Sequence, residues 1–293
     1  MKKLSFLLLL ISAATFGQNQ RFIYEYQFKT DSTDTENPLN KEMMYLDVAK
    51  KGSKYYSRDK FVSDSIMSAE FEKQMASQRG STHIYINYSG GKKGKVGHII
   101  EKSYPDFKIS HFSSLGSEEY KIEDSREMEW SILPEKEKIG EFDTQKATTV
   151  FAGRKWTAWF TTEIPIQDGP YKFRGLPGMI VKVEDASKTH IIEMKSSQKL
   201  NGEEWKSAAE SGGVLRDKAP ISIDEKKFKK LFIEHRNDPT KNLRQIMSQG
   251  DSFQIRDANG NPIDTAKMLR DREEKQKEAN KKNNNLLELD LLK

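Results

Sequence analysis

The sequence predicts a mainly β protein, a β-rich α+β fold built on a many-stranded curved antiparallel sheet or open half-barrel with two or three helices. Short runs in which apolar and polar residues alternate recur along the chain, with turn residues between them. Strands that follow one another in this way usually pair as antiparallel neighbours. The chain has 293 residues, 35% of them hydrophobic, which is enough for a large core. We expect residues 18–293 to form a single domain.

The N-terminus has the features of a signal peptide over residues 1–17. Two lysines precede an apolar run from Leu4 to Ala14, and small residues then suit cleavage before Gln18. The apolar run is too short to span a membrane. We therefore expect an exported protein that is periplasmic, associated with the outer membrane or secreted, with no transmembrane segment in the mature chain.

Composition narrows the classes of partner. The formal net charge is +5, or +3 without the two N-terminal lysines, and no long basic block is present. Nucleic acid is therefore not an expected partner. The chain contains no cysteine, so an exported form must fold without disulfides and cannot carry a lipid-modified cysteine.

Residues 21–29 predict the first strand. Phe22, Tyr24, Tyr26 and Phe28 share one face of an extended chain, and mostly polar residues occupy the other. The same kind of pattern predicts further strands at 42–49, 54–58, 82–88, 95–102, 104–112 and 119–123.

One stretch in this half of the chain has a helical period. Met67, Phe71 and Met75 recur at every fourth residue behind the polar residue Ser63, which suits a helix N-cap. A short amphipathic helix is predicted over 63–78.

The middle of the chain predicts a central strand, a shaped loop and a second strand. Residues 154–163 carry large rings on both faces, which is typical of a strand covered on both sides. A connection rich in proline and glycine follows, and residues 179–183 are again β-prone. Within the connection, residues 176–179 (Leu-Pro-Gly-Met) predict a type II turn, since proline presets its first central position and Gly178 takes a positive φ at the second.

The next signals are a hairpin and helices. Residues 190–194 are β-prone and close a hairpin with 179–183, whereas the apolar residues of 224–235 have helical spacing. A further helical turn is predicted at 243–247.

The C-terminal end predicts a polar helix and a strand. Asn259-Gly260 favours a hairpin turn. Residues 265–282 are polar nearly all round, which predicts a solvated helix or a partly disordered insertion. Over 286–292 leucines alternate with acidic residues, which predicts a closing strand.

The hexapeptide Gly175-Leu176-Pro177-Gly178-Met179-Ile180 resembles the signature of the GLPGLI family, a group of exported proteins of Bacteroidetes. Further residues match the pattern of that family: Trp130, Lys146-Ala147, Gly153-Arg154, 158–161, 164–166, Gly169-Pro170, Phe173 and 285–289. Met179 replaces the usual leucine, which conserves volume. The resemblance is strong over 130–184, and it implies export, an envelope location and a β-rich body without an established activity.

The aromatic residues around this segment are the candidate ligand-binding residues. They are Trp156, Trp159, Phe160, Tyr171 and Phe173, together with Arg154. A curved sheet is concave, and concave surfaces with aromatic walls commonly hold ligands. We expect a non-enzymatic envelope protein, without a cofactor, that binds an apolar ligand or assists an outer-membrane partner.

Two alternative functions have weaker support. A hydrolase would use Glu163 or Asp168 with Arg154, but no histidine or serine stands in a defined spacing to them. A periplasmic metal-binding protein would use some of the five histidines, His83, His98, His111, His190 and His235, which lack a chelating spacing. We therefore assign no catalytic residue and no metal ligand from the sequence.

Overall fold

The computed structural model describes residues 19–77, 94–201, 205–210, 219–249 and 264–293. Its centre is one open sheet of twelve strands in the order β12-β6-β5-β4-β3-β2-β1-β11-β10-β9-β8-β7. The strands are β1 (Gln20–Phe28), β2 (Asn40–Ala49), β3 (Gly52–Ser57), β4 (Ile99–Ser103), β5 (Ile109–Leu115), β6 (Glu118–Asp124), β7 (Ser131–Ile139), β8 (Phe142–Phe151), β9 (Arg154–Thr161), β10 (Met179–Asp185), β11 (His190–Lys199) and β12 (Ile221–Asp224). The predicted fold class, a curved and mostly antiparallel open sheet with helices, is confirmed.

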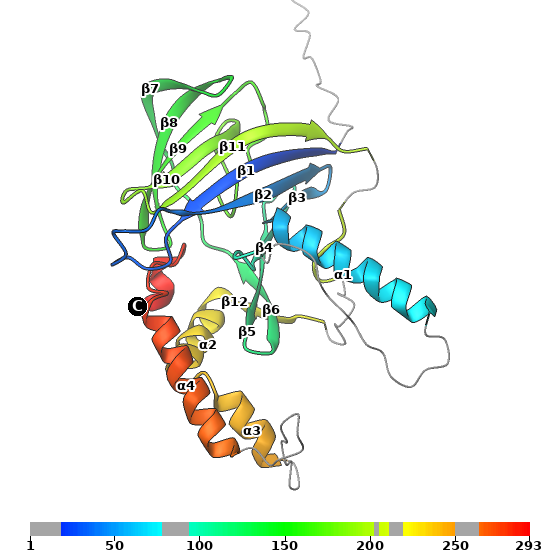
Figure 1. The fold of residues 1–293 in the computed structure, drawn as a ribbon. Helices are drawn as coiled ribbons and strands as arrows, with labels where there is room; N and C mark the ends of the chain where they lie inside the picture. The colour runs from blue at the N-terminus through cyan, green and yellow to red at the C-terminus, as the bar shows by residue number, and fades with distance from the viewer. Residues whose placement is uncertain (1–18, 78–93, 202–204, 211–218, 250–263) are drawn as a thin grey trace, which may run out of the picture.

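The topology joins two meanders through the first strand. β1 pairs with β2 on one side and with β11 on the other, both antiparallel. Among the paired strands, β12 and β6 form a parallel pair. Figure 1 shows that the sheet is strongly bent, with β5, β6 and β12 running below the part formed by β1 to β3 and β7 to β11.

The alternation seen in the sequence explains the inner face of β1. Phe22, Tyr24, Tyr26 and Phe28 are all buried, with at most 6% of each side chain exposed, and the residues between them are half-buried. Because β1 has a paired strand on each side, its apolar face lies in the middle of the core.

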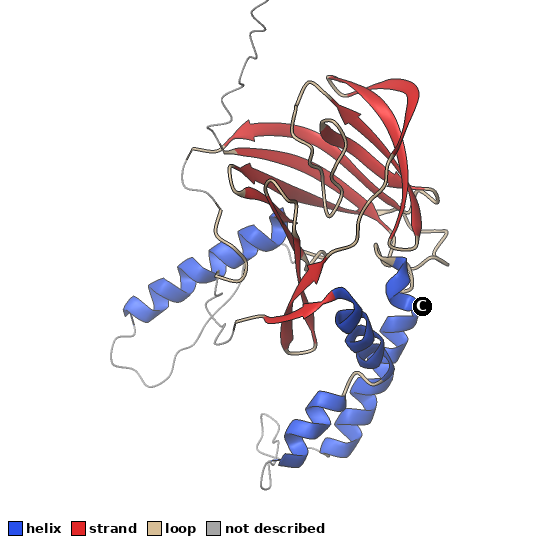
Figure 2. Ribbon diagram, turned by 180° about the vertical axis from the view of Figure 1, so that it is seen from behind, coloured by secondary structure: helices blue, strands red, loops and turns tan. Residues whose placement is uncertain are grey.

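The described residues form four α-helices, each of which overlaps a predicted helical stretch. They are α1 (Arg58–Ser77), α2 (Glu225–Asn237), α3 (Lys241–Gln249) and α4 (Thr265–Lys281). The first is not the short amphipathic helix predicted over 63–78: it begins at Arg58, so Ser63 lies inside it, and none of its residues is buried. In both ribbon views α2 lies near β5, β6 and the C-terminal end of α4, α3 lies beside the other end of α4, and α1 extends away on its own (Figures 1 and 2). None of the described helices combines the length and the apolar character that crossing a membrane requires.

Capping chemistry fixes where α2 begins. The side chain of Asp224 accepts a hydrogen bond from the backbone N–H of Lys227, which satisfies one donor of the first turn. Phe228 is the buried residue of this helix, and it packs with Ile122 and Leu291 in a small second core.

Residues 162–178, called the central loop below, fill the hollow of the sheet. Tyr171 lies beside His111 of β5 with 6.2 Å between ring centroids, and Phe173 lies 4.9 Å from Trp156 of β9. β5 and β9 are far apart in the sheet order, so one loop can reach both only from inside the curve. Figure 2 shows loop segments crossing in front of the strands on that side.

The predicted type II turn with a positive φ at Gly178 is wrong. Gly178 donates its N–H to the carbonyl of Leu176 at 2.7 Å, which closes a tighter turn around Pro177. Within the hexapeptide 175–180, the residue with a positive φ is Gly175, at +90°. Gly178 is needed for a different reason: a Cβ atom there would lie 2.0 Å from the carbonyl oxygen of Thr161.

The predicted closing strand over 286–292 is also wrong. Leu289–Leu292 forms a 3-10 helix, labelled η1, and Leu291 is buried. The backbone N–H groups of Leu289 and Asp290 both point at one acceptor, the carbonyl of Ala152. A strand would use acceptors spread along a neighbour, so this convergence excludes a ladder.

Several predicted features lie outside the described residues. They are the signal peptide over 1–17, the strand over 82–88 and the hairpin turn at 259–260.

Candidate functional site: buried ion pairs around the central loop

A buried ion pair anchors the first half of the central loop to β4. Lys102 is on the inner face of β4, and its ammonium group contacts the carboxylate of Asp168, with both side chains 0% exposed. The same ammonium group donates to the carbonyl oxygens of Gly169 at 2.6 Å and Tyr171 at 3.0 Å. Tyr104 donates its hydroxyl to the other oxygen of Asp168. Burial lowers the pKa of Lys102, and the neighbouring Asp168 charge opposes that shift.

A second network holds the other half of the loop. The ammonium group of Lys172 donates to Asp124 at the end of β6, at 2.7 Å, and also contacts Glu288 from the C-terminal segment. Arg126 bonds both oxygens of Asp124, at 2.9 and 2.6 Å, and lies 2.9 Å from Glu288. The hydroxyl of Tyr171 donates to Glu288 at 2.6 Å. Three separate parts of the chain therefore meet at one amine.

The charges in this second network fix the ionisation of its carboxyl groups. Burial would raise the pKa of Glu288, but the charges of Lys172 and Arg126 outweigh it and lower that pKa to about 2. The same balance, with Arg126 as the main hydrogen-bond donor, lowers the pKa of Asp124. Burial lowers the pKa of His98 to about 4, and the Lys172 charge adds to that shift.

Arg154 fastens the C-terminal segment to the sheet. Its guanidinium group bonds Asp185 of β10 at 2.9 Å, the side chain of Asn285 at 2.6 Å and the carbonyl of Leu286. His190 lies between Tyr26, whose hydroxyl is 2.6 Å from Nδ1, and the carbonyl of Asn285, 3.0 Å from Nε2. A carbonyl can only accept, so Nε2 carries the ring proton and the Tyr26 hydroxyl donates to Nδ1.

Most of the predicted ligand-binding residues lie together in the core. Trp156, Phe160, Tyr171 and Phe173 are at most 3% exposed, and Arg154 is 7% exposed. Trp159 directly precedes Phe160 on β9, so its side chain points to the opposite face of the sheet, where it lies near Lys146. The structure thus brings four of the six residues into one cluster, which the central loop now fills.

The residues of the hydrolase alternative do not meet. Asp168 is paired with Lys102, whereas Arg154 is paired with Asp185. Glu163 accepts a hydrogen bond from the backbone of Asp143 near the surface. Within the described part of the chain, no three histidine or acidic residues gather as a metal site would require.

Sequence reasoning did not identify the residues that form the buried ion pairs around the central loop. They are Lys102, Asp124, Lys172 and Glu288. Lys102 follows Ile100, and Asp124 follows Ile122, each two positions along a strand. Residues two positions apart on a strand share a face. Lys102 and Asp124 therefore each lie on the same inward face as a buried isoleucine. This pattern was the available signal.

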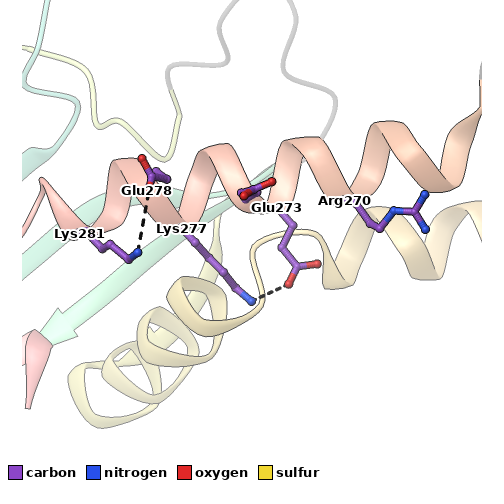
Figure 3. A pocket seen from close by; sticks show the side chains of 6 residues that line it. Arg270, Glu273, Lys277, Glu278 and Lys281 are labelled. Atoms are coloured by element: carbon purple, nitrogen blue, oxygen red, sulfur yellow. Dashed lines mark hydrogen bonds and ion pairs between the residues drawn. The ribbon is translucent and has the colours of Figure 1, made fainter.

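A shallow surface hollow of about 420 Å³ runs along α4. Six residues line it: Arg270, Glu273, Glu274, Lys277, Glu278 and Lys281 (Figure 3). They project from one side of the helix, and Lys277 pairs with Glu273 within the same helix at 2.6 Å. All six are charged and paired charges recur along the helix, so the hollow has the character of a solvated helix face.

Comparisons with known proteins give a partial family match and a distant structural likeness. No curated protein matches the chain. Among solved structures, PNGF-II in space group P21 has a TM-score of 0.47 and 14% identity, over 75% of this chain and 34% of that one. PNGF-II in space group C2 has a TM-score of 0.46 and 13% identity, over 75% and 33%. The chain thus spans about a third of the length of these structures. Residues 121–182, from β6 through the central loop into β10, match the model of a family described as proteins of unknown function (Porph_ging).

Proposed function

We propose that this chain is an exported cell-envelope protein of the GLPGLI type that works by binding an outer-membrane protein partner through α1. The GLPGLI-like hexapeptide at 175–180, the Porph_ging match and the N-terminal features at 1–17 support the envelope assignment. The chemistry around the central loop supports a non-enzymatic role, because its carboxylates are used in buried ion pairs with lysine and arginine.

The observation that carries the proposal is the number of exposed apolar side chains on α1. Phe61, Val62, Ile66 and Met75 are each 39% to 46% exposed, and α1 has no buried residue over its 20 positions. Single exposed apolar residues are ordinary, but four on one projecting helix favour a contact surface.

The chemistry of α1 suits an apolar partner surface. Methionine and phenylalanine supply adaptable contact area, which is common at protein-binding surfaces. Acidic and basic residues are mixed along the helix, at Asp59, Lys60, Glu72 and Lys73, so no single charge dominates. An apolar groove on the partner therefore fits better than a strongly charged surface.

Photocrosslinking in cells tests this proposal. A photoreactive residue at Ile66 or Met75 is expected to join the chain to one outer-membrane protein, and the same residue at exposed Lys275 of α4 is the matched control. Crosslinks from α4 but not from α1, or none from α1, would contradict it. N-terminal sequencing of the exported protein, expected to start at Gln18, checks the export step separately.

A second candidate function is binding of an apolar ligand at the predicted aromatic residues. Trp156, Phe160 and Phe173 support it because they form a large aromatic cluster in the hollow, and Tyr171 brings a hydroxyl to its edge. A ligand would have to take the place of part of the central loop. Native mass spectrometry of protein purified from the envelope tests this: a retained lipid that Phe173→Ala abolishes supports binding, and ligand-free protein contradicts it.

A further inference from the structure

The contacts of Lys172 differ from those of an ordinary buried ion pair. Its ammonium group donates to Asp124 at 2.7 Å and contacts Glu288, and the three side chains are 1%, 0% and 5% exposed. An amine that is held against two carboxyl groups in a site without water can also react as a nucleophile. One carboxyl group can be attacked by the amine, while the other moves the protons that the reaction releases.

Arg126 supplies the charge that such an attack needs. It bonds both oxygens of Asp124, at 2.9 and 2.6 Å, so it withdraws electron density from that carboxyl carbon. Of these two donors, Nε–H bonds Oδ1, the oxygen on which negative charge would develop during attack, whereas the other donor bonds Oδ2, the oxygen next to the amine. Arg126 also bonds Glu288 at 2.9 Å and thereby fixes the second carboxylate beside the amine.

The energetics of burial favour a product with fewer charges. Lys172, Arg126, Asp124 and Glu288 bring four formal charges together in a region of low polarity. Joining Lys172 to Asp124 removes one positive and one negative charge, and the Arg126–Glu288 pair remains balanced. The free energy of the folded state then no longer includes the desolvation of two buried ions.

We propose that Lys172 and Asp124 form an intramolecular amide bond, with Glu288 as the proton carrier and Arg126 as the stabiliser of the oxyanion. Lys172 first passes one proton to Asp124, which leaves a neutral amine and a neutral acid. The nitrogen lone pair attacks Cγ of Asp124, and the carbonyl electrons move onto the oxygen that Arg126 holds. Glu288 takes a second proton from nitrogen and gives it to the Asp124 hydroxyl, which leaves as water when the C–O bond breaks. The amide nitrogen keeps the third hydrogen, and Glu288 returns to its carboxylate form.

This bond would tie the end of β6 to the central loop in a chain that has no cysteine. The pair Lys102–Asp168 is a natural comparison within the same molecule, because it is equally buried. The other described partners of that ammonium group are the carbonyls of Gly169 and Tyr171, which cannot carry a proton from nitrogen to a leaving oxygen. We therefore expect Lys102–Asp168 to remain an ion pair.

Peptide mapping of the full-length wild-type protein tests the proposal without relying on any variant to fold. Trypsin should leave a branched peptide that joins residues 122–126 to residues 156–174, lighter than the sum of its two parts by one water molecule, with Lys172 uncleaved. Fragmentation should place the link between Lys172 and Asp124. Unlinked peptides, or a link through Glu288 or Lys102 instead, would overturn the assignment.

Two variants test the proposed roles. Glu288→Gln keeps the shape of the side chain but removes the proton carrier, so the branched peptide should fall at least tenfold in yield. Lys102→Arg is the matched control at the comparison pair and should leave the branched peptide at the wild-type level. An undiminished branched peptide in folded Glu288→Gln would refute the proton-carrier role. If Glu288→Gln fails to fold, the wild-type peptide map still decides whether the bond exists.

Discussion

The ammonium group of Lys102 and the carboxylate of Asp168 contact each other with no part of either side chain exposed to solvent. The pair joins the inner face of β4 to the central loop, 66 positions later in the sequence. A buried charge without a counter-ion strongly destabilises the fold, so each partner of the pair compensates the desolvation of the other. The loop is thus held in the hollow by charge as well as by its aromatic residues.

Removing one partner of this pair should strongly destabilise the fold. Lys102→Met leaves Asp168 without its counter-ion, and we expect the free energy of unfolding to fall by about 3–5 kcal/mol in urea denaturation. Lys277→Met, which breaks a surface pair with Glu273, should change it by less than about 1 kcal/mol. The double variant Lys102→Met, Asp168→Leu should recover part of the loss. Equal effects of the buried and surface substitutions would show that the pair does not hold the loop.

Gly178→Ala should destabilise the protein through a clash. The new Cβ would lie 2.0 Å from the carbonyl oxygen of Thr161, a backbone atom that cannot move aside without shifting β9. We expect a loss of roughly 1–3 kcal/mol, the usual range for overpacking. Gly97→Ala is the control, because nothing lies within 4 Å of a Cβ at that position. Thermal denaturation compares the two, and equal melting temperatures would contradict the close approach at Gly178.

His190 should make stability depend on pH in mildly acidic solution. Burial, together with the Arg154 charge, lowers the pKa of His190 to about 4, below the value near 6.5 expected in the unfolded chain. Between these values the unfolded state binds a proton that the folded state does not, so stability is complete above pH 6.5 and falls toward pH 4. One histidine contributes a slope of up to about 1.4 kcal/mol per pH unit.

Urea denaturation at several pH values from 7 to 4.5 measures this slope for the wild type and for His190→Gln. The difference between the two slopes isolates His190 from His98, whose pKa is also lowered. Carboxylates with a lowered pKa, such as Glu288, begin to lose their contribution only below about pH 5, so the slope between pH 7 and about 5 comes from the histidines. Identical slopes would mean that His190 is not held neutral by the fold.

Period-two alternation predicted the strands well because it is a local property. The inward face of β1, for example, follows directly from the spacing of its four aromatic residues between Phe22 and Phe28. The central loop was located correctly, but its turn was not. The reason is that Gly178 is constrained by the carbonyl of Thr161, a contact that only the folded structure creates.

The candidate site shows the same limit. Lys172 and Glu288 are 116 positions apart, and neither neighbourhood signals a buried charge. Lys102 and Asp124 did carry a signal, since each shares a strand face with a buried isoleucine. The alternation of leucines over 286–292 led to the wrong prediction of a strand for a related reason. The segment is fixed by Asn285 and the carbonyl of Ala152, so long-range hydrogen bonds override its β-like pattern.

Asn285→Ala should loosen the C-terminal segment. The side chain of Asn285 accepts from Arg154 at 2.6 Å and donates to the carbonyl of Lys29 at 2.9 Å, so its removal leaves a buried guanidinium donor and a backbone carbonyl without that partner. We expect a loss of about 1–3 kcal/mol in the free energy of unfolding, the usual cost of stranding buried polar groups. Asn284→Ala is the matched control, because the bonds of Asn284 to Ser32 and Lys281 are exposed to water, which can replace them, and its remaining bond, to Asp31, is long at 3.3 Å. Limited proteolysis adds a local measurement. Cleavage after Lys281 and Lys282 should accelerate in Asn285→Ala and stay at the wild-type rate in Asn284→Ala, since only the buried amide links this segment to both Arg154 and Lys29. Equal cleavage rates in the two variants would assign the anchoring of the segment to Glu288 and Leu291 instead.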